Sequence, residues 1–309
     1  MIRFNSIRTK ILIFLIPILL IAFTTLSTLG YKFASKSLRS SNLEIMKEMT
    51  KVAASKADDK INGEIDNIEA LACTPIMTNK EISIEEKIEF LKKTAENKGL
   101  IEMSVGDTEG NFINTKGKIK NTKTSQSYIN SMTGISSITN PYIDTETNKK
   151  VVTYSAPIMD SENKVIGMIT STKDCSDFIS LADEIKFLET GSIVIVDSYG
   201  NIIVSSDDEM IQGNNNITEM KSENEDLSKL NGIGKNMITS TECGIGKYIY
   251  NNKEKYMSYM PIGKTGLSLG ITVEEKDLLR ALDGLKSINL IVTVVMILYI
   301  SLQLLLLNL

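Results

Sequence analysis

The side chains that most often do chemistry in proteins are absent from this chain or scattered along it. Its 309 residues include no histidine, which excludes a Ser-His triad and a phosphorelay histidine and removes the commonest zinc ligand. Cys73, Cys175 and Cys243 lie far apart, so buried thiols are favoured over a disulfide framework or a metal knuckle. Carboxylates that meet only after folding are left open. We predict no catalytic residues, no metal site, no cofactor and no enzyme activity.

The charge balance bears on the class of partner. The chain has 34 Lys and Arg against 38 Asp and Glu, a net charge of −4. Nucleic-acid binding usually requires a clustered basic face, and the sequence has no such cluster. We therefore expect no nucleic-acid partner.

Both ends of the chain are apolar. Residues 11–29 and 288–307 carry no charge, and each run is close to the roughly 20 residues that cross a bilayer as a helix. A cleaved signal peptide is the alternative for the first run, but that run is longer than a usual signal core and continues into a helical pattern. Arg3, Arg8 and Lys10 favour a cytoplasmic N-terminus. We predict residues 1–10 inside, transmembrane helices at 11–30 and 288–307, and residues 31–287 outside the cell membrane.

The elements between the spans change from helical to strand-like along the chain. Apolar residues recur at helical spacing from Leu38 to Leu71, and Pro75 ends the pattern, which predicts a stalk helix over 31–73. A second amphipathic helix is expected over 84–97. Short β-branched runs then follow at 103–105, 112–113, 151–154, 165–169 and 193–196.

A turn motif occurs twice. Asp107-Thr-Glu-Gly-Asn111 and Asp197-Ser-Tyr-Gly-Asn201 are each followed by an apolar pair, about ninety residues apart. Two copies in strand-rich stretches indicate that a small antiparallel module is repeated. We place the boundary between the modules near 178–188, a polar surface loop at 205–231, and a helix over 273–287 that leads into the second span.

Several segments together resemble the double Cache sensor domain of bacterial chemoreceptors, over about residues 31–285. They are 140–158, with Asn140-Pro-Tyr at their start, then Gly167, 189–201 and 255–269. The resemblance implies an α+β fold in which two stacked PAS-like antiparallel-sheet modules lie on the long N-terminal helix. The distal module would cover 74–178 and the proximal one 179–272, flanked by the two transmembrane helices.

The resemblance also implies a small-ligand pocket between the distal sheet and a capping helix. Amino-acid-binding members of the family share Arg-x-Trp-Tyr before that helix and an Asp after the last strand of the module. This chain has Ser-Gln-Ser-Tyr at 125–128, and Lys173 followed by Asp174 at the other position, so we do not expect an α-amino acid. The candidate ligand-binding residues are Tyr128, Tyr142, Asp144, Tyr154, Asp174, Ser125, Ser127 and Lys173.

Structural roles compete with ligand binding at several of these positions. Strand tyrosines often half-bury against a sheet, and Asp144 can cap the turn that follows it. We leave both roles open for Tyr128, Tyr142 and Asp144, and favour the structural role for Tyr154.

The expected function is a membrane-anchored, extracytoplasmic sensor of a small polar solute, of chemoreceptor type, which signals by helix displacement. Only Asn308 and Leu309 follow the second span, so we expect no output domain in this chain. Signalling would then run through a homodimer, or a heterodimer with full-length chemoreceptors, formed by the stalk and the spans in the lipid. The alternatives are an anchored solute-binding or structural envelope module, or a non-signalling receptor remnant.

Overall fold

The computed structural model describes residues 7–175, 178, 180–181, 184–206, 216–221 and 226–306. It divides into two compact units, of which one contains the described parts of Met1–Ile45 and Glu274–Leu309 and the other is Met46–Val273. The predicted boundary at 178–188 and the predicted loop at 205–231 lie partly outside the described residues.

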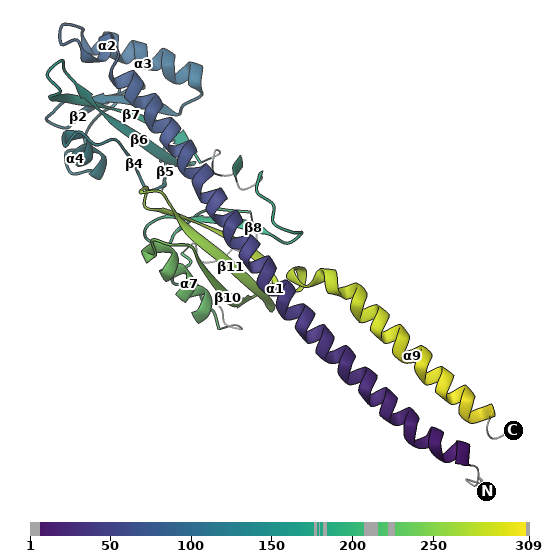
Figure 1. The fold of residues 1–309 in the computed structure, drawn as a ribbon. Coiled ribbons are helices and arrows are strands. Elements are labelled where there is room, and N and C mark those ends of the chain that lie inside the picture. The colour runs from purple at the N-terminus through teal and green to yellow at the C-terminus, as the bar shows by residue number, and fades with distance from the viewer. Residues whose placement is uncertain are drawn as a thin grey trace. The chain divides into compact units, whose positions relative to one another are not determined.

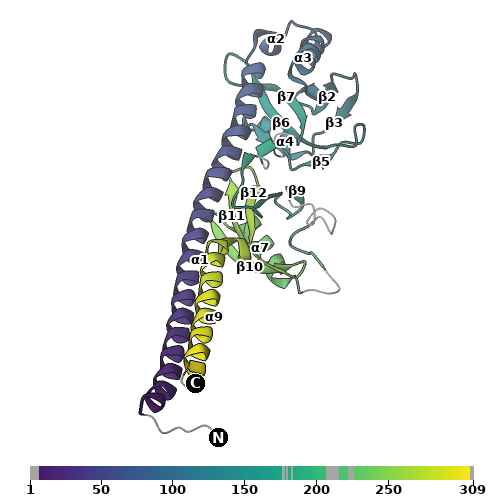
Figure 2. The ribbon, with the colours of Figure 1, turned by 90° about the vertical axis from the view of Figure 1, so that its right-hand side faces the viewer.

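The first unit consists of helices from both ends of the chain. They are the N-terminal part of α1 (Ile7–Ala72), α8 (Glu275–Leu278), the 3-10 turn η1 (Arg280–Leu282) and α9 (Asp283–Leu306). In this unit α1 and α9 lie side by side (Figures 1 and 2). Arg39 contacts Glu275 at 2.7 Å, and the Asn42 amide donates to the Leu278 carbonyl at 2.8 Å. The single helix expected over 273–287 is not formed: strand β12 (Leu267–Glu274) occupies its start, α8 and η1 follow, and only its last residues belong to α9.

Two helices among the described residues are long and apolar enough to cross a membrane. They are α1, counted from Pro17, and the segment Arg280–Tyr299. Of the predicted spans, residues 17–30 and 288–299 fall within these two regions. Length and composition thus fit a membrane anchor.

The second unit begins with the rest of α1 and carries a seven-stranded antiparallel sheet in the order β3-β2-β1-β7-β6-β4, with β5 also paired to β6. Ser83 caps α3 by accepting a hydrogen bond from the Glu86 amide, and Gly99 ends it with a φ of 64°. The elements of this distal module are α2 (Pro75–Thr78), α3 (Ile84–Lys98), β1 (Glu102–Gly106), β2 (Asn111–Asn114), β3 (Ile119–Asn121), α4 (Gln126–Met132), β4 (Ser137–Ile138), β5 (Tyr142–Ile143), β6 (Lys150–Met159) and β7 (Val165–Asp174).

A second, five-stranded sheet forms the proximal module, in the order β10-β11-β12-β8-β9. Its elements are β8 (Ser192–Val196), β9 (Ile202–Ser205), α7 (Ser228–Thr239), β10 (Gly244–Tyr250), β11 (Lys253–Ile262) and β12 (Leu267–Glu274). Figure 2 shows both sheets stacked along α1. The α+β class, with two antiparallel sheets on a long N-terminal helix, is confirmed.

The repeated turn has the same geometry in both modules. Asp107 Oδ1 accepts from the Asn111 backbone amide at 2.9 Å, and Asp197 Oδ1 accepts from that of Asn201 at 2.8 Å. In each turn the second aspartate oxygen accepts from the same asparagine's side chain at 2.9 Å. The glycine before each asparagine has a positive φ, 83° and 85°. The motif is therefore a side-chain-capped turn that needs Gly for its backbone.

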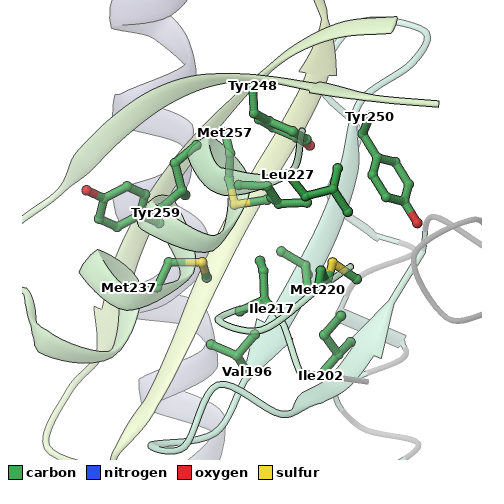
Figure 3. Close-up of a cluster of buried hydrophobic side chains, with 13 residues drawn as sticks. Val196, Ile202, Ile217, Met220, Leu227, Met237, Tyr248, Tyr250, Met257 and Tyr259 are labelled. Carbon is green, nitrogen blue, oxygen red and sulfur yellow. The ribbon is translucent and has the colours of Figure 1, made fainter. Parts of the chain in front are cut away.

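The interior of the proximal module is filled by apolar side chains (Figure 3). Ile217, Met220 and Leu227 come from the segment between β9 and α7 and are at most 5% exposed. They pack in one cluster with Tyr248 and Met257 of the sheet. The expectation of a surface loop over 205–231 is therefore wrong for these residues, because they complete the core.

Two glycines should respond in opposite ways to the same substitution. A Cβ on Gly167 of β7 would lie 2.5 Å from the Gly106 carbonyl oxygen of β1, so these paired strands would have to separate. Gly63, inside α1, has nothing within 4 Å of that position. We expect Gly167→Ala to lower the free energy of unfolding by about 2–3 kcal/mol and Gly63→Ala to raise it by up to about 1 kcal/mol. Denaturant unfolding of the purified chains measures both, and equal effects would contradict the packing described here.

Candidate ligand-binding site

A cavity of about 210 Å³ lies in the distal module, on one face of the seven-stranded sheet. It combines side chains of the strands with residues before and within α4 and from the β4–β5 region. Most of its lining residues have polar side chains. The lining residues are Glu102, Ser104, Phe112, Asn114, Lys118, Lys120, Thr122, Ser125, Ser127, Thr139, Tyr142, Thr153, Met168, Thr170 and Thr172.

The strand register creates the floor of this cavity. Residues directly opposite one another in neighbouring strands point to the same face of a sheet. Thr172 lies opposite both Glu102 and Thr153, and Thr170 lies opposite Ser104. Alternate residues of β1, β6 and β7 therefore present a carboxylate and several hydroxyls to the cavity.

Part of this polar surface is bonded internally. The Tyr142 hydroxyl lies 2.9 Å from Thr153 Oγ1, which lies 2.9 Å from Thr172 Oγ1. Thr139 Oγ1 accepts a hydrogen bond from the Thr153 amide at 3.0 Å. This row of hydroxyls fixes the position of the Tyr142 ring, which is 44% exposed.

Other polar atoms of the lining have no protein partner. Across the described part of the chain, four lining hydroxyls form no side-chain hydrogen bond, those of Ser104, Thr122, Ser127 and Thr170. Half-buried hydroxyls left open in a cavity are bonded by water or by a solute. The site can thus offer several hydrogen bonds to a small polar molecule.

Charged groups gather at the β2–β3 side of the cavity. The Asn114 amide donates to Glu102 Oε2 at 2.9 Å, and Lys116 Nζ lies 3.8 Å from the same oxygen. Lys116 and Lys118 both contact Glu146, the first at 2.7 Å. The pKa of Glu146 is lowered mainly by the hydrogen bond from Lys116 and next by the one from Lys118. The same bond to Glu146 raises the pKa of Lys116.

The position of Glu146 makes this cluster a bridge. Glu146 belongs to the turn between β5 and β6, near one edge of the sheet, whereas both lysines follow β2, near the other edge. These ion pairs, next to Glu102, therefore join segments from the two edges of the sheet. These contacts help to enclose the cavity.

Three of the residues expected in the site line this cavity, Ser125, Ser127 and Tyr142. Tyr128 does not: its side chain is buried against Phe112 and Met168, and its hydroxyl donates to the Thr108 carbonyl at 2.6 Å. Because Phe112 and Met168 are lining residues, Tyr128 supports the wall from behind. It is not among the lining residues, so a direct ligand contact of Tyr128 stays a prediction.

Tyr154 and Lys173 lie on the opposite face of the sheet, because each is one residue out of phase with the lining threonines. Tyr154 is 3% exposed. Lys173 Nζ pairs with Glu64 Oε1 of α1 at 2.9 Å. Neither residue lines the cavity: Tyr154 is buried, as its favoured structural role requires, and Lys173 attaches the sheet to the stalk helix.

The two aspartates also have other partners. Asp144 Oδ2 accepts from the Thr147 hydroxyl at 2.6 Å and from its amide at 2.8 Å, and the hydroxyl bond is the main cause of the lowered pKa of Asp144. Asp174 Oδ2 lies 3.5 Å from Lys149 Nζ. Neither carboxylate lines the cavity, so Asp144 is a turn cap and Asp174 pairs at the end of β7.

Sequence reasoning missed the floor of the site. On β1, Glu102 and Ser104 alternate with the buried apolar residues Met103 and Val105, and on β7 Thr170 and Thr172 stand on either side of the buried Ser171. That alternation marks a polar face, and it was the available signal. Which strands pair, and therefore which polar residues meet, comes only from the fold.

Comparison with known proteins gives one family. The family model described as Cache domain matches residues 34–282. No curated protein matches the chain.

Solved structures with a similar fold include ligand-binding domains of chemoreceptors. The sensory domain of Campylobacter jejuni Tlp3 with isoleucine bound has 18% identity and a TM-score of 0.60, over 80% of this chain and 98% of that one. Pseudomonas aeruginosa PctB in complex with L-Arg has 18% identity and a TM-score of 0.56, over 75% and 94%. Pseudomonas fluorescens CtaA in complex with L-isoleucine has 15% identity and a TM-score of 0.57, over 80% and 98%.

Proposed function

This chain belongs to the Cache domain family, and on that premise we propose that it is a membrane-anchored sensor of a small polar solute. The observation that carries the proposal is the distal cavity, where the hydroxyls of Ser104, Thr122, Ser127 and Thr170 form no side-chain hydrogen bond within the described residues. The proximal module offers a contrast, because its interior is filled by apolar side chains. The distal module is therefore the proposed binding site.

The similar structures support this assignment through their fold. The Tlp3, PctB and CtaA domains were each solved with a small amino-acid ligand. This chain has the same arrangement of two sheets on a long helix, and its cavity lies in the distal sheet module.

The proposed location is the cell membrane, with residues 31–287 outside and both candidate spans in the lipid. The two apolar helices support this topology. The proposed partner is a second copy of the chain or a full-length chemoreceptor, which would pair along α1. Ile45 and Val52, seven residues apart, are 49% and 58% exposed and would face it. A mass of one chain in detergent, measured by light scattering, would argue against a second copy.

Direct contacts between the modules support transmission of a signal. Lys150 Nζ of β6 donates to the carbonyls of Ile202 and Ile203 on β9, at 2.8 and 3.1 Å. The Asn140 side chain donates to the Ser198 hydroxyl at 2.9 Å. In the proposal, solute binding shifts these contacts and then the helix after β12, by the ångström or two typical of such transitions.

A stability screen tests the proposed function. The purified full chain in lipid nanodiscs is melted with a broad set of amines, amino acids, organic acids and sugars. Because a ligand bound only by the native state stabilises it, a solute at 100 times its Kd should add about 2.7 kcal/mol, or roughly 5–10 °C in Tm. One narrow group of solutes should act. A broad set without any shift would contradict a sensor role.

A further inference from the structure

We propose that the distal cavity takes a small zwitterion whose ammonium and anionic groups are separated by several bonds. This inference rests on the proposed function and specifies the chemistry of its ligand. Two opposite charges of the lining carry it, Glu102 on β1 and Lys120 on β3. Within the described residues, one carboxylate oxygen of Glu102 has no hydrogen bond and the Lys120 ammonium has no ion pair.

Glu102 offers one open carboxylate oxygen. Both of its contacts, with the Asn114 amide and with Lys116, are made through Oε2. Oε1 forms no hydrogen bond within the described residues, and the Glu102 side chain is only 21% exposed. A half-buried carboxylate oxygen binds best to a charged donor, because such hydrogen bonds are about twice as strong as neutral ones. An ammonium group fits this position.

Lys120, on β3, is the positively charged lining residue without an ion pair in the described residues. It lies opposite Phe112 in the β2–β3 pair and therefore points to the face that Phe112 lines. Its ammonium has no ion pair in the part of the chain that the structure describes, whereas the neighbouring Lys118 is paired with Glu146. A carboxylate or another small anion is the matching ligand group.

The register sets the separation of these charges. Glu102 and Gly106 are four residues apart on β1, about 13 Å, and Lys120 lies two strands from Gly106, about 10 Å. These two distances lie roughly at right angles, so the two Cα atoms are about 16 Å apart. Because both side chains line the same cavity, their charged groups come somewhat closer, to about 10–15 Å. After one hydrogen bond of about 2.8 Å at each end, the ligand's own charges must be about 5–9 Å apart. An α-amino acid, with both charges on one carbon, is too short to reach both.

The surface between the two charges suits such a molecule. The Ser104 and Thr170 hydroxyls lie between them on the floor, and Phe112 and Met168 supply apolar surface for a methylene chain. The volume of about 210 Å³ corresponds to about seven waters in the bulk liquid. A neutral polyol would fit the hydroxyls but would leave the charges of Glu102 and Lys120 without partners.

The test uses isothermal titration of the full chain in nanodiscs with linear ω-amino acids. We expect the tightest binding with three to five methylenes between the amine and the carboxylate. Alanine, n-butylamine and butyrate each lack the separation or one of the charges, and should bind about 10- to 100-fold more weakly. A series without any dependence on length would overturn the proposal.

Two variants test the two charged groups of the ligand one at a time. Glu102→Gln should weaken the best ω-amino acid by about 10-fold or more and leave the ω-hydroxy acid of the same length within about 3-fold. Lys120→Gln should weaken the ω-amino acid and leave the matching alkylamine unchanged. Lys92→Gln, at an exposed position on α3, is the matched control and should change neither. Unchanged affinities in both site variants would overturn the assignment.

The outcomes distinguish this inference from the function on which it rests. If the stability screen identifies a sugar or a dicarboxylate and no ω-amino acid binds, the ligand class is wrong and the sensor function stands. If neither the screen nor the titrations detect any ligand, both fail.

Discussion

A Thr170→Trp chain should fold and yet lose all stabilisation by its solute. Thr170 lies in the middle of the cavity floor, with Ser104 and Ser155 opposite it on the neighbouring strands. It is partly exposed to the cavity, so an indole ring can enter the space of about 210 Å³ without displacing the core. The gain of about 2.7 kcal/mol at 100 times Kd should fall to zero. Thermal melts with and without the solute measure it.

Ile119→Trp provides the matched control for this experiment. Ile119 lies on β3 and is 72% exposed, and its neighbour in the sequence, Lys120, faces the cavity from the other side of the strand. This variant should keep the full response to the solute. A Thr170→Trp chain that responds like Ile119→Trp would place the binding site elsewhere in the molecule.

Local patterns in the sequence are sufficient to predict most of the elements. Helical spacing from Leu38 to Leu71 anticipates α1, which ends at Ala72, and Ser83 anticipates the start of α3. The motif from Asp107 to Asn111 anticipates a capped turn, which its hydrogen bonds show. These features depend on neighbours within a few residues, so periodicity and turn chemistry suffice.

The site depends on pairings that local patterns do not contain. Tyr142 and Tyr154 both lie on strands, but only the registers of β5 and β7 with β6 decide that one lines the cavity and the other is buried on the opposite face. Glu102 and Thr172 are seventy residues apart and meet because β1 pairs with β7. A one-residue difference in phase reverses the face that a side chain occupies.

Composition also misled in the proximal module. The stretch between β9 and α7 is polar on average, which favoured a surface loop. Three of its apolar residues, Ile217, Met220 and Leu227, are nevertheless buried in the core of that module. The average polarity of a segment does not show which of its residues are buried, because three apolar side chains are enough to pack an otherwise polar segment against the core.

A single reactive cysteine in the cavity can report on both the location and the ligand. Ser127 lines the cavity, and its hydroxyl forms no hydrogen bond among the described residues, so Ser127→Cys changes little else. Cys73 and Cys243 are accessible and are replaced by serine in the test chain. Cys175 can stay, because burial raises the pKa of its thiol to about 11 and keeps it protonated and unreactive.

The most direct test is to treat intact cells that express this chain with a membrane-impermeant maleimide, with and without the stabilising solute. The account predicts that Ser127→Cys is labelled from outside and that saturating solute reduces labelling at least 10-fold. A chain that keeps Cys73 as its only accessible thiol should be labelled equally in both conditions. Labelling of Ser127→Cys only after the cells are permeabilised, or labelling that the solute does not reduce, would contradict an outward-facing sensor with its ligand in the distal cavity.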